Sequence, residues 1–160
     1  MREKILTFLE KNSRIDISEL AVILGEDEEA VAREIKAMED EHIICGYHTM
    51  INWDKVSTNW VSALIEVRVT PQRGQGFDKI ADRICNYPEV GSVYIISGDY
   101  DLLVDVEGRT LQEVSQFVSE KLATLDSVIS TRTNFILKRY KDHGTVMNVQ
   151  EEHERLMVTP

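Results

Sequence analysis

The stretch GEDEEAVAREIKAMEDE, residues 25–41, decides how the first fifty residues of this chain fold. Val31, Ile35 and Met38 recur in it at helical spacing, so the stretch predicts a helix with one apolar face. Asp27 stands where the N-cap of that helix is expected. The same stretch carries eight acidic and only two basic residues. Its charges therefore raise the question of whether this helix can face nucleic acid.

Two shorter helices are predicted before it. The apolar face of the first is formed by Ile5, Leu6, Phe8 and Leu9, and that of the second by Leu20, Ala21 and Leu24. Asp16 followed by Glu19 has the spacing of a capping box, and Gly25 suits the end of the second helix. A short β-rich run, residues 43–51, comes last. The order is that of a winged helix-turn-helix, with a plain three-helix bundle as the alternative.

The rest of the chain predicts a ferredoxin-like domain. Alternating apolar residues predict strands at 60–70, 90–96, 101–107 and 128–137, and helical spacing predicts helices after Phe77 and after Thr110. The order β-α-β-β-α-β places both helices on one face of the sheet. We therefore expect an α+β chain. Its parts are a winged helix-turn-helix at 1–48, a linker strand at 49–59, a ferredoxin-like domain at 60–141 and a tail at 142–160.

The sheet face that these helices leave open is expected to be apolar. It is predicted to carry Leu64, Tyr94, Ile96, Leu103 and Ile136. Large apolar side chains gathered on one surface usually mark an interaction site. We therefore expect a homodimer in which two sheets stack on each other.

Composition narrows the function and the compartment. The formal net charge of −10 argues against non-specific binding to nucleic acid. No apolar run is long enough to span a membrane, and the N-terminus has no apolar core of a signal peptide. Cys45 and Cys85 stand far apart, as expected of reduced thiols in the cytoplasm. No catalytic motif or metal-ligand spacing is present in the sequence, so neither enzyme activity nor a cofactor is expected.

Four stretches together resemble the Lrp/AsnC (feast–famine) family of transcriptional regulators. They are LAVILG (20–25), REIKAMEDEHIICGY (33–47), SGDYDLLVDV (97–106) and STRTNFILKRYK (130–141). The resemblance implies DNA binding by the N-terminal domain, and sensing of an amino acid or a related metabolite by the C-terminal (RAM) domain. It also implies dimers that assemble further, commonly into octamers.

The predicted DNA-binding residues lie on the helix of the opening stretch. They are Glu28, Glu29, Arg33 and Lys36. Arg33 and Lys36 match the family pattern. Acidic residues replace the family's hydroxyl residues and proline at the start of the helix, and His42 stands where members have glycine. The acids weaken attraction to phosphate, although Glu can accept a hydrogen bond from cytosine. We therefore expect weak binding by each helix, strengthened by assembly.

The predicted effector-binding residues are Ser97, Gly98, Asp99, Tyr100 and Asp101, with Thr131 and Thr133 on the last strand. Read by themselves, the glycine and the acids are good hairpin residues. The resemblance implies an effector pocket at this loop, between dimers. Asp99 and Asp101 would then receive the ammonium of an amino acid, and backbone N–H groups its carboxylate.

Two alternatives keep this fold without DNA binding. One is a sensor that acts through protein partners, and the other is an enzyme similar in architecture to the sirohaem decarboxylases. An acidic helix would suit either alternative. The second needs basic and His side chains around a tetrapyrrole carboxylate, and the sequence does not visibly cluster them.

Overall fold

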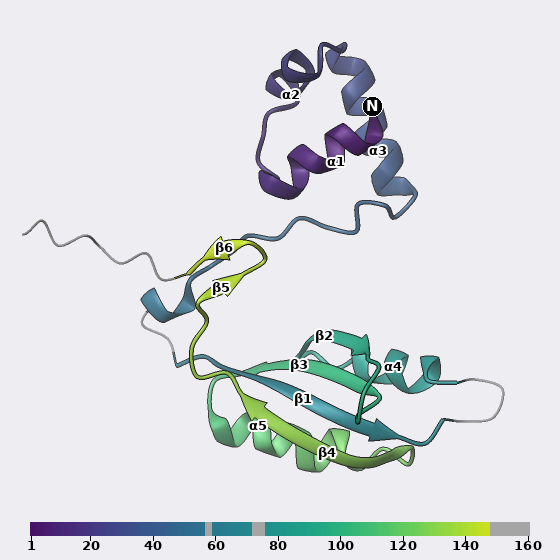
Figure 1. Ribbon diagram of the computed structural model, residues 1–160, viewed down its shortest axis with the longest axis vertical. Helices are drawn as coiled ribbons and strands as arrows, with labels where there is room; N and C mark the ends of the chain where they lie inside the picture. The colour runs from purple at the N-terminus through teal and green to yellow at the C-terminus, as the bar shows by residue number, and fades with distance from the viewer. Residues whose placement is uncertain (57–58, 72–75, 148–160) are drawn as a thin grey trace, which may run out of the picture. The chain divides into compact units, whose positions relative to one another are not determined.

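The computed structural model describes residues 1–147 except 57–58 and 72–75 (Figure 1). It divides into two compact units, of which the first is Met1–Ile51 and the second begins at Asn52. Each unit has its own apolar core. Among the described residues, no helix combines the length and the apolar character needed to cross a membrane.

The first unit is built from three helices, α1 (Arg2–Lys11), α2 (Ile17–Leu24) and α3 (Glu28–Asp40). They enclose a small core formed by Ile5, Leu20, Ala21, Val31 and Met38. The predicted faces of all three helices are therefore confirmed. Because this core is small, the hydrogen bonds at the helix ends contribute a noticeable share of the stability of the unit.

The turn between α2 and α3 follows the local rules of helix ends. Gly25 adopts a left-handed conformation with a φ of 68°, and its N–H donates to the Val22 carbonyl at 3.3 Å. The Asp27 carboxylate accepts a hydrogen bond from the Ala30 N–H at 3.2 Å. Asp16 occupies the N-cap of α2, but within the described structure its side chain makes no cap hydrogen bond. The capping box predicted there is therefore not formed.

Residues 43–51 form no strand in the structure, so the wing predicted for this run is not observed. The N–H groups of Ile43 and Ile44 instead donate to the Met38 carbonyl, at 2.8 and 3.1 Å, and close the end of α3. A strand needs a neighbour to pair with, and residues 1–51 offer none. The first unit is thus observed as a three-helix unit.

The predicted linker strand is also absent from the described part of 49–59. Trp53–Lys55 form a single turn of 3₁₀-helix, and the ring of Trp53 stacks on that of Trp60 with centroids 5.4 Å apart. Asn52 donates to the backbone carbonyl of Met147 at 2.7 Å. A hairpin of β5 (Lys141–Asp142) and β6 (Thr145–Val146) spans the predicted start of the tail. Residues 148–160 lie outside the described residues.

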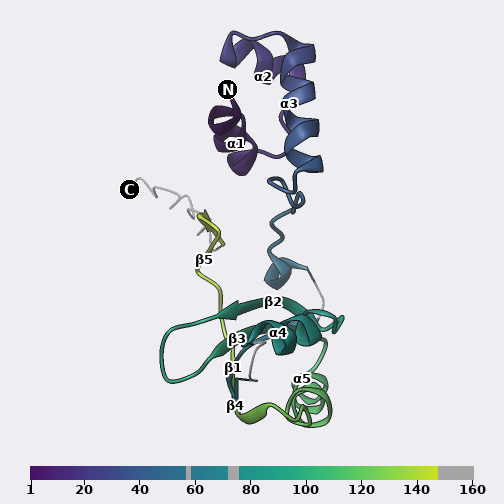
Figure 2. The ribbon, with the colours of Figure 1, turned by 90° about the vertical axis from the view of Figure 1, so that its right-hand side faces the viewer.

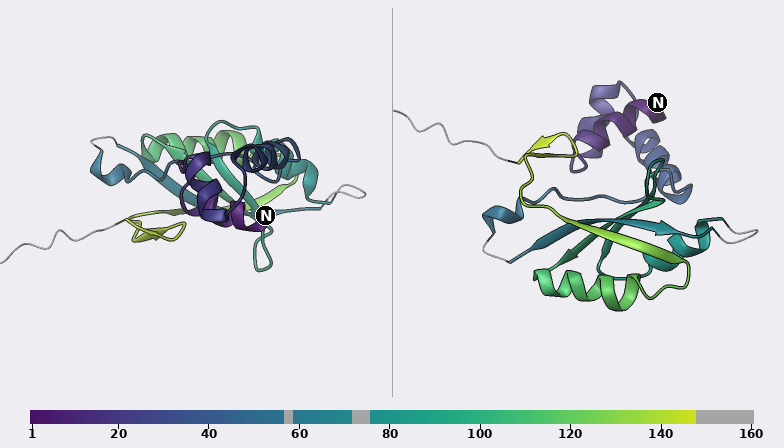
Figure 3. Two further views of the ribbon diagram at one scale, coloured as in Figure 1. Left: turned by 90° about the horizontal axis from the view of Figure 1, so that it is seen from above. Right: turned by 60° about the horizontal axis from the view of Figure 1, so that its bottom comes forward.

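The second unit contains the predicted β-α-β-β-α-β order. Its strands are β1 (Val61–Val69), β2 (Val90–Ile95), β3 (Leu102–Gly108) and β4 (Val128–Phe135), arranged β2-β3-β1-β4 with every pair antiparallel. The helices are α4 (Asp78–Cys85) and α5 (Leu111–Phe117), which continues into a π-helical segment, Val118–Leu122. Figures 2 and 3 show both helices on the same side of the sheet. The ferredoxin-like fold is therefore confirmed.

The helix-covered face holds the core of this unit. Ala63, Ile65 and Val67 of β1 are fully buried there, beside Val104 and Val106 of β3. Side-chain hydrogen bonds cap the start of α5: the Thr110 hydroxyl accepts from the Glu113 N–H at 3.0 Å, and the Glu113 carboxylate accepts from the Arg109 N–H at 2.7 Å.

His42 holds a backbone conformation that favours glycine, with a φ of 57°. Because a side chain at such a φ costs about 1–2 kcal/mol, we expect His42→Gly to stabilise the first unit by about 1 kcal/mol. Gly25→Ala is the matched control and should destabilise it by a similar amount. Hydrogen exchange of the α3 amides in the full chain measures both changes. Equal or faster exchange in His42→Gly would show that the turn is unstrained.

Candidate DNA-binding and effector-binding sites

One side of α3 carries a stripe of exposed charges. Glu29, Arg33, Lys36 and Asp40 are all exposed, and their spacing of four, three and four residues aligns them along the helix. The buried Val31 and Met38 lie on another side. Reading along the stripe, the order is acid, base, base, acid. The predicted residues Arg33 and Lys36 are therefore together at the centre of an outward surface.

The acid at the C-terminal end of the stripe forms an ion pair with one of these two bases. Lys36 Nζ lies 2.7 Å from Asp40 Oδ1, one helical turn away. This hydrogen bond raises the pKa of Lys36. Both side chains are well exposed, so water and salt weaken the ion pair. Another anion can therefore readily displace the Asp40 carboxylate from Lys36. A phosphate that contacts Lys36 must compete with Asp40.

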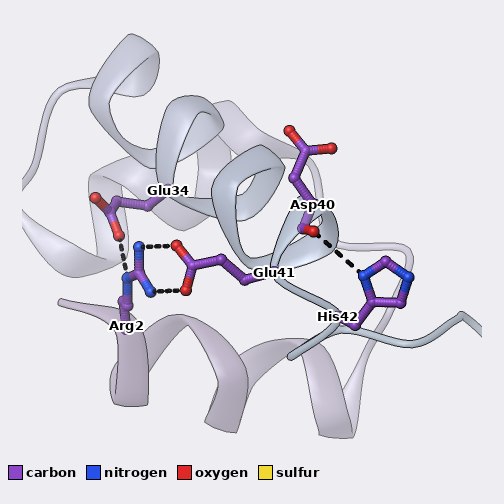
Figure 4. Close-up of polar contacts among 5 residues, drawn as sticks. All are labelled: Arg2, Glu34, Asp40, Glu41 and His42. Atoms are coloured by element: carbon purple, nitrogen blue, oxygen red, sulfur yellow. Dashed lines mark hydrogen bonds and ion pairs between the residues drawn. The ribbon is translucent and has the colours of Figure 1, made fainter.

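A second cation is held by two acids at the edge of the first unit (Figure 4). Arg2 Nε donates to Glu34 at 2.7 Å, and its two terminal nitrogens donate to Glu41 at 2.7 and 3.0 Å. The hydrogen bonds to Glu41 and Glu34 raise the pKa of Arg2, while Arg2 lowers the pKa of Glu41. Arg2 therefore joins the start of α1 to α3.

Glu28 and Glu29 are exposed in the first turn of α3, where acids stabilise the positive end of the helix dipole. Both acids therefore have a structural role in stabilising α3. Arg33 is exposed, and no described residue forms an ion pair with it. Arg33 is therefore the cation of α3 that is directly available to an anion.

The predicted effector loop, residues 97–100, joins β2 to β3 and is fastened to the end of β1. Both Nε and Nη2 of Arg68 donate to the Asp99 carbonyl, at 3.1 and 2.5 Å. The Asp101 carboxylate accepts a hydrogen bond from the Val69 N–H at 2.8 Å. Ser97, Gly98 and Asp99 are exposed. Asp101 therefore shapes the hairpin in this structure, whereas Asp99 is open to solvent.

Tyr100 lies beside two arginines that the sequence did not single out. The guanidinium carbon of Arg68 is 5.4 Å from the centroid of the Tyr100 ring, and that of Arg132 is 5.2 Å from it. Both distances suit cation–π contacts. Arg132 also lies 3.5 Å from Glu66 in an ion pair across β1 and β4. A cluster of charged groups thus surrounds the ring, on the open face of the sheet.

Thr131 and Thr133 are not part of this cluster. They pair with Val67 and Ile65, and directly opposed residues of antiparallel strands project to the same face. Val67 and Ile65 are fully buried on the helix-covered face. The two threonines therefore project to that face, away from Tyr100. The prediction that they line one wall with the loop is not supported by this arrangement.

The open face mixes apolar and charged side chains. Tyr94, Leu103, Glu66 and Arg132 form one row across all four strands. Leu64 pairs with Asp105 in the next row. Burial raises the pKa of the Asp105 carboxyl, and Glu107 raises it further. Leu64, Tyr94 and Leu103 of the predicted apolar patch thus lie on this face, and the carboxylates of Glu66 and Asp105 interrupt it.

Comparison with known proteins finds relatives for both halves of the chain. Residues 62–146 match the Lrp/AsnC ligand binding domain. The HTH-type transcriptional regulator YugG of Bacillus subtilis, itself uncharacterized, is 46% identical over 98% of this chain and 95% of its own. The proline dehydrogenase transcriptional activator of Rhodobacter capsulatus is 32% identical over 80% and 82% of the two chains.

Solved structures of the same fold include two regulators. The NMB0573/L-Met complex of Neisseria meningitidis superposes with a TM-score of 0.70 at 24% identity, over 89% of this chain and 92% of that one. Escherichia coli AsnC superposes with a TM-score of 0.65 at 22% identity, over 85% and 89%. The sequence relatives and the matched ligand-binding domain establish the family, and the present chain belongs to the Lrp/AsnC family of transcriptional regulators.

Proposed function

We propose that this protein binds double-stranded DNA in a sequence-specific manner and adjusts transcription in response to an amino acid. The observation that carries the DNA part is the exposed stripe of α3, with Arg33 and Lys36 at its centre. In a helix-turn-helix this helix enters the major groove, where arginine and lysine contact phosphates or guanine. Membership of a family of transcriptional regulators supports the same function.

Glu28 and Glu29 remain in the proposed DNA surface as specificity residues. A glutamate in the groove accepts from the cytosine amino group and repels phosphate. These acids and the Lys36–Asp40 pair lower the affinity of one helix for DNA of any sequence. Two or more helices bound to adjacent half-sites recover affinity through their linkage.

The effector is proposed to bind beside the loop of Ser97, Gly98, Asp99 and Tyr100. The matched region is a ligand-binding domain, and a protein of the same fold is a complex with L-Met. The exposed Asp99 and the ring of Tyr100 beside two guanidinium groups suit a ligand that carries both charges.

Assembly is proposed to use the open face of the sheet, with a second copy of the chain stacked on Leu64, Leu103 and their neighbours. Such a homodimer would cover apolar side chains that are only partly shielded within one chain. Further association into an octamer would bring several α3 helices to one DNA segment. The proposed location of the protein is the cytoplasm, as for other transcriptional regulators.

The DNA surface is tested by removing its cations. We expect Arg33→Ala and Lys36→Ala each to weaken binding of the full-length protein to DNA from upstream of its own gene, by roughly tenfold if the residue contacts a base. A residue that contacts only phosphate should lower the salt slope of binding by about one. Electrophoretic retardation across a salt series measures both effects. Lys79→Ala, on the helix layer of the second unit, is the control and should change neither.

Asp40→Asn is the complementary variant. It removes the partner of Lys36 and leaves the buried face of α3 untouched, so binding to DNA should become tighter. The increase should disappear when Lys36→Ala is added, because the two residues act through one contact. Unchanged retardation of Arg33→Ala, Lys36→Ala and Asp40→Asn would exclude α3 as the DNA-contacting helix.

The hairpin role of Asp101 is tested by stability. Asp101→Ala leaves the Val69 N–H without its acceptor, so the free energy of unfolding should fall by about 1–2 kcal/mol. Asp101→Asn keeps an acceptor oxygen, so its free energy of unfolding should fall less. The free energy of unfolding of Asp99→Ala should remain near that of the parent. Urea unfolding followed by the fluorescence of Trp53 and Trp60, both in the second unit, reports these values. A stability loss in Asp99→Ala equal to that in Asp101→Ala would contradict this division of roles.

The homodimer is tested by charging the open face. We expect the full-length protein to sediment as a dimer or larger at micromolar concentration, and Leu103→Glu to shift it towards the monomer. Leu111→Glu is the matched control, because Leu111 is 57% exposed at the start of α5 on the helix side. A parent protein that sediments as a monomer would contradict the proposed assembly.

A further inference from the structure

A small cavity lies on the helix side of the second unit, where the end of β1, helix α4 and the turn before β4 meet. Its volume is about 140 Å³. Pockets for drug-sized ligands measure roughly 300–1,000 Å³, so this cavity suits only a small ligand. The buried Ile80 forms an apolar part of the wall, and most of the other lining residues are polar or charged.

Two cations line the cavity from α4. Lys79 and Arg83 are one helical turn apart, so their side chains project from the same side of the helix. Both are exposed, and neither forms an ion pair with a residue that the structure describes. Lysine and arginine offer only N–H donors, and the planar fork of arginine suits the oxygens of a carboxylate or a phosphate. This side of the cavity therefore suits an anion.

Two hydroxyl groups and one acid complete the polar lining. The Thr70 N–H donates to the Ser127 carbonyl at 2.8 Å, which holds these two hydroxyl-bearing residues side by side. Asp126 lines the same cavity, yet within the described structure it forms no ion pair with either cation of α4. An ionised carboxylate can only accept hydrogen bonds. A ligand that bridges these groups must therefore accept from the cations and donate to Asp126.

We propose that this cavity is a second ligand site, which binds inorganic phosphate in its monohydrogen form. The phosphate oxygens accept from Lys79 and Arg83, and the P–OH group donates to Asp126. Sulfate carries no proton at neutral pH, and a phosphate monoester, with a second pKa of about 6, is largely without one. The phosphodiesters of nucleic acid also lack it. Asp126 repels these three anions, so the site selects inorganic phosphate.

The surroundings favour a local site over general attraction of anions. The chain has a formal net charge of −10, so its overall field repels phosphate. The cavity lies on the helix side, whereas the proposed homodimer uses the open face of the sheet, so a stacked second copy leaves the cavity accessible. None of its lining residues belongs to the proposed effector loop. Phosphate and an amino acid can therefore bind to one chain at the same time.

Phosphorus NMR of inorganic phosphate in the presence of the full-length protein tests this proposal. Binding broadens the phosphate signal, and a titration at neutral pH and constant ionic strength gives the Kd. We expect the parent to bind phosphate. Lys79→Gln and Arg83→Gln should each raise the Kd by roughly tenfold, because each variant loses a charge-assisted hydrogen bond. Arg109→Gln, an exposed arginine of the same unit, is the matched control and should keep the Kd of the parent.

Competition by sulfate gives a readout that charge alone would not change. With the parent, the inhibition constant of sulfate should exceed the Kd of phosphate by about tenfold or more, because sulfate has no proton for Asp126. A phosphate monoester should compete as weakly as sulfate. Asp126→Asn replaces the carboxylate by an amide that can donate, so sulfate should then compete about as well as phosphate.

The possible results decide the site and its ligand separately. An unbroadened signal with the parent, or equal Kd values for the parent, Lys79→Gln and Arg83→Gln, would overturn the site. Equal competition by sulfate and phosphate in the parent would contradict the role of Asp126 and the choice of phosphate. Urea unfolding checks that each variant keeps the stability of the parent. DNA binding of the same variants should match the parent, so failure of this inference leaves the proposed function standing.

Discussion

The antiparallel register of β1 with its two neighbours is the constraint on which the second unit depends. Because β1 lies between β3 and β4, its residues 63–67 each have a partner on both sides, and a shift by one residue would exchange the two faces of the sheet. The buried Ile65 and Val67 make such a shift costly. The same register places Glu66 opposite Arg132 and brings Arg68 to the end of the strand, beside the loop. The apolar face of β1 thus determines where the charges of the opposite face meet.

Much of the fold could be predicted from the sequence because its signals are local. The helices of the first unit, the turn at Gly25 and the alternation of β1 each need only a few neighbouring residues. The predicted wing and linker strand failed for the opposite reason. A strand depends on a partner elsewhere, and residues 43–51 have an apolar composition but no neighbouring strand in the described chain.

The candidate effector site likewise has parts that local sequence predicts and parts that it does not. The loop at 97–101 was found from its residues, but the roles within it were not. Thr131 and Thr133 were assigned to the loop because they lie on the right strand, and only the pairing with Val67 and Ile65 shows that they project to the other face. Glu66 and Arg132 are far apart in sequence and ordinary as strand residues. Their juxtaposition follows from a non-local register that no local pattern contains.

The pairing of charges within the first unit also has a kinetic consequence. Arg2 is neutralised by Glu34 and Glu41, Lys36 by Asp40, and residues 1–48 contain twice as many acids as bases. A surface of this kind has no long-range positive field, and at physiological salt the remaining field decays within about 8 Å. Such a protein cannot be drawn to DNA from a distance. Its encounter rate should resemble that of uncharged partners, on the order of 10⁵–10⁶ M⁻¹s⁻¹, so selection among sites is made by how long each complex lasts.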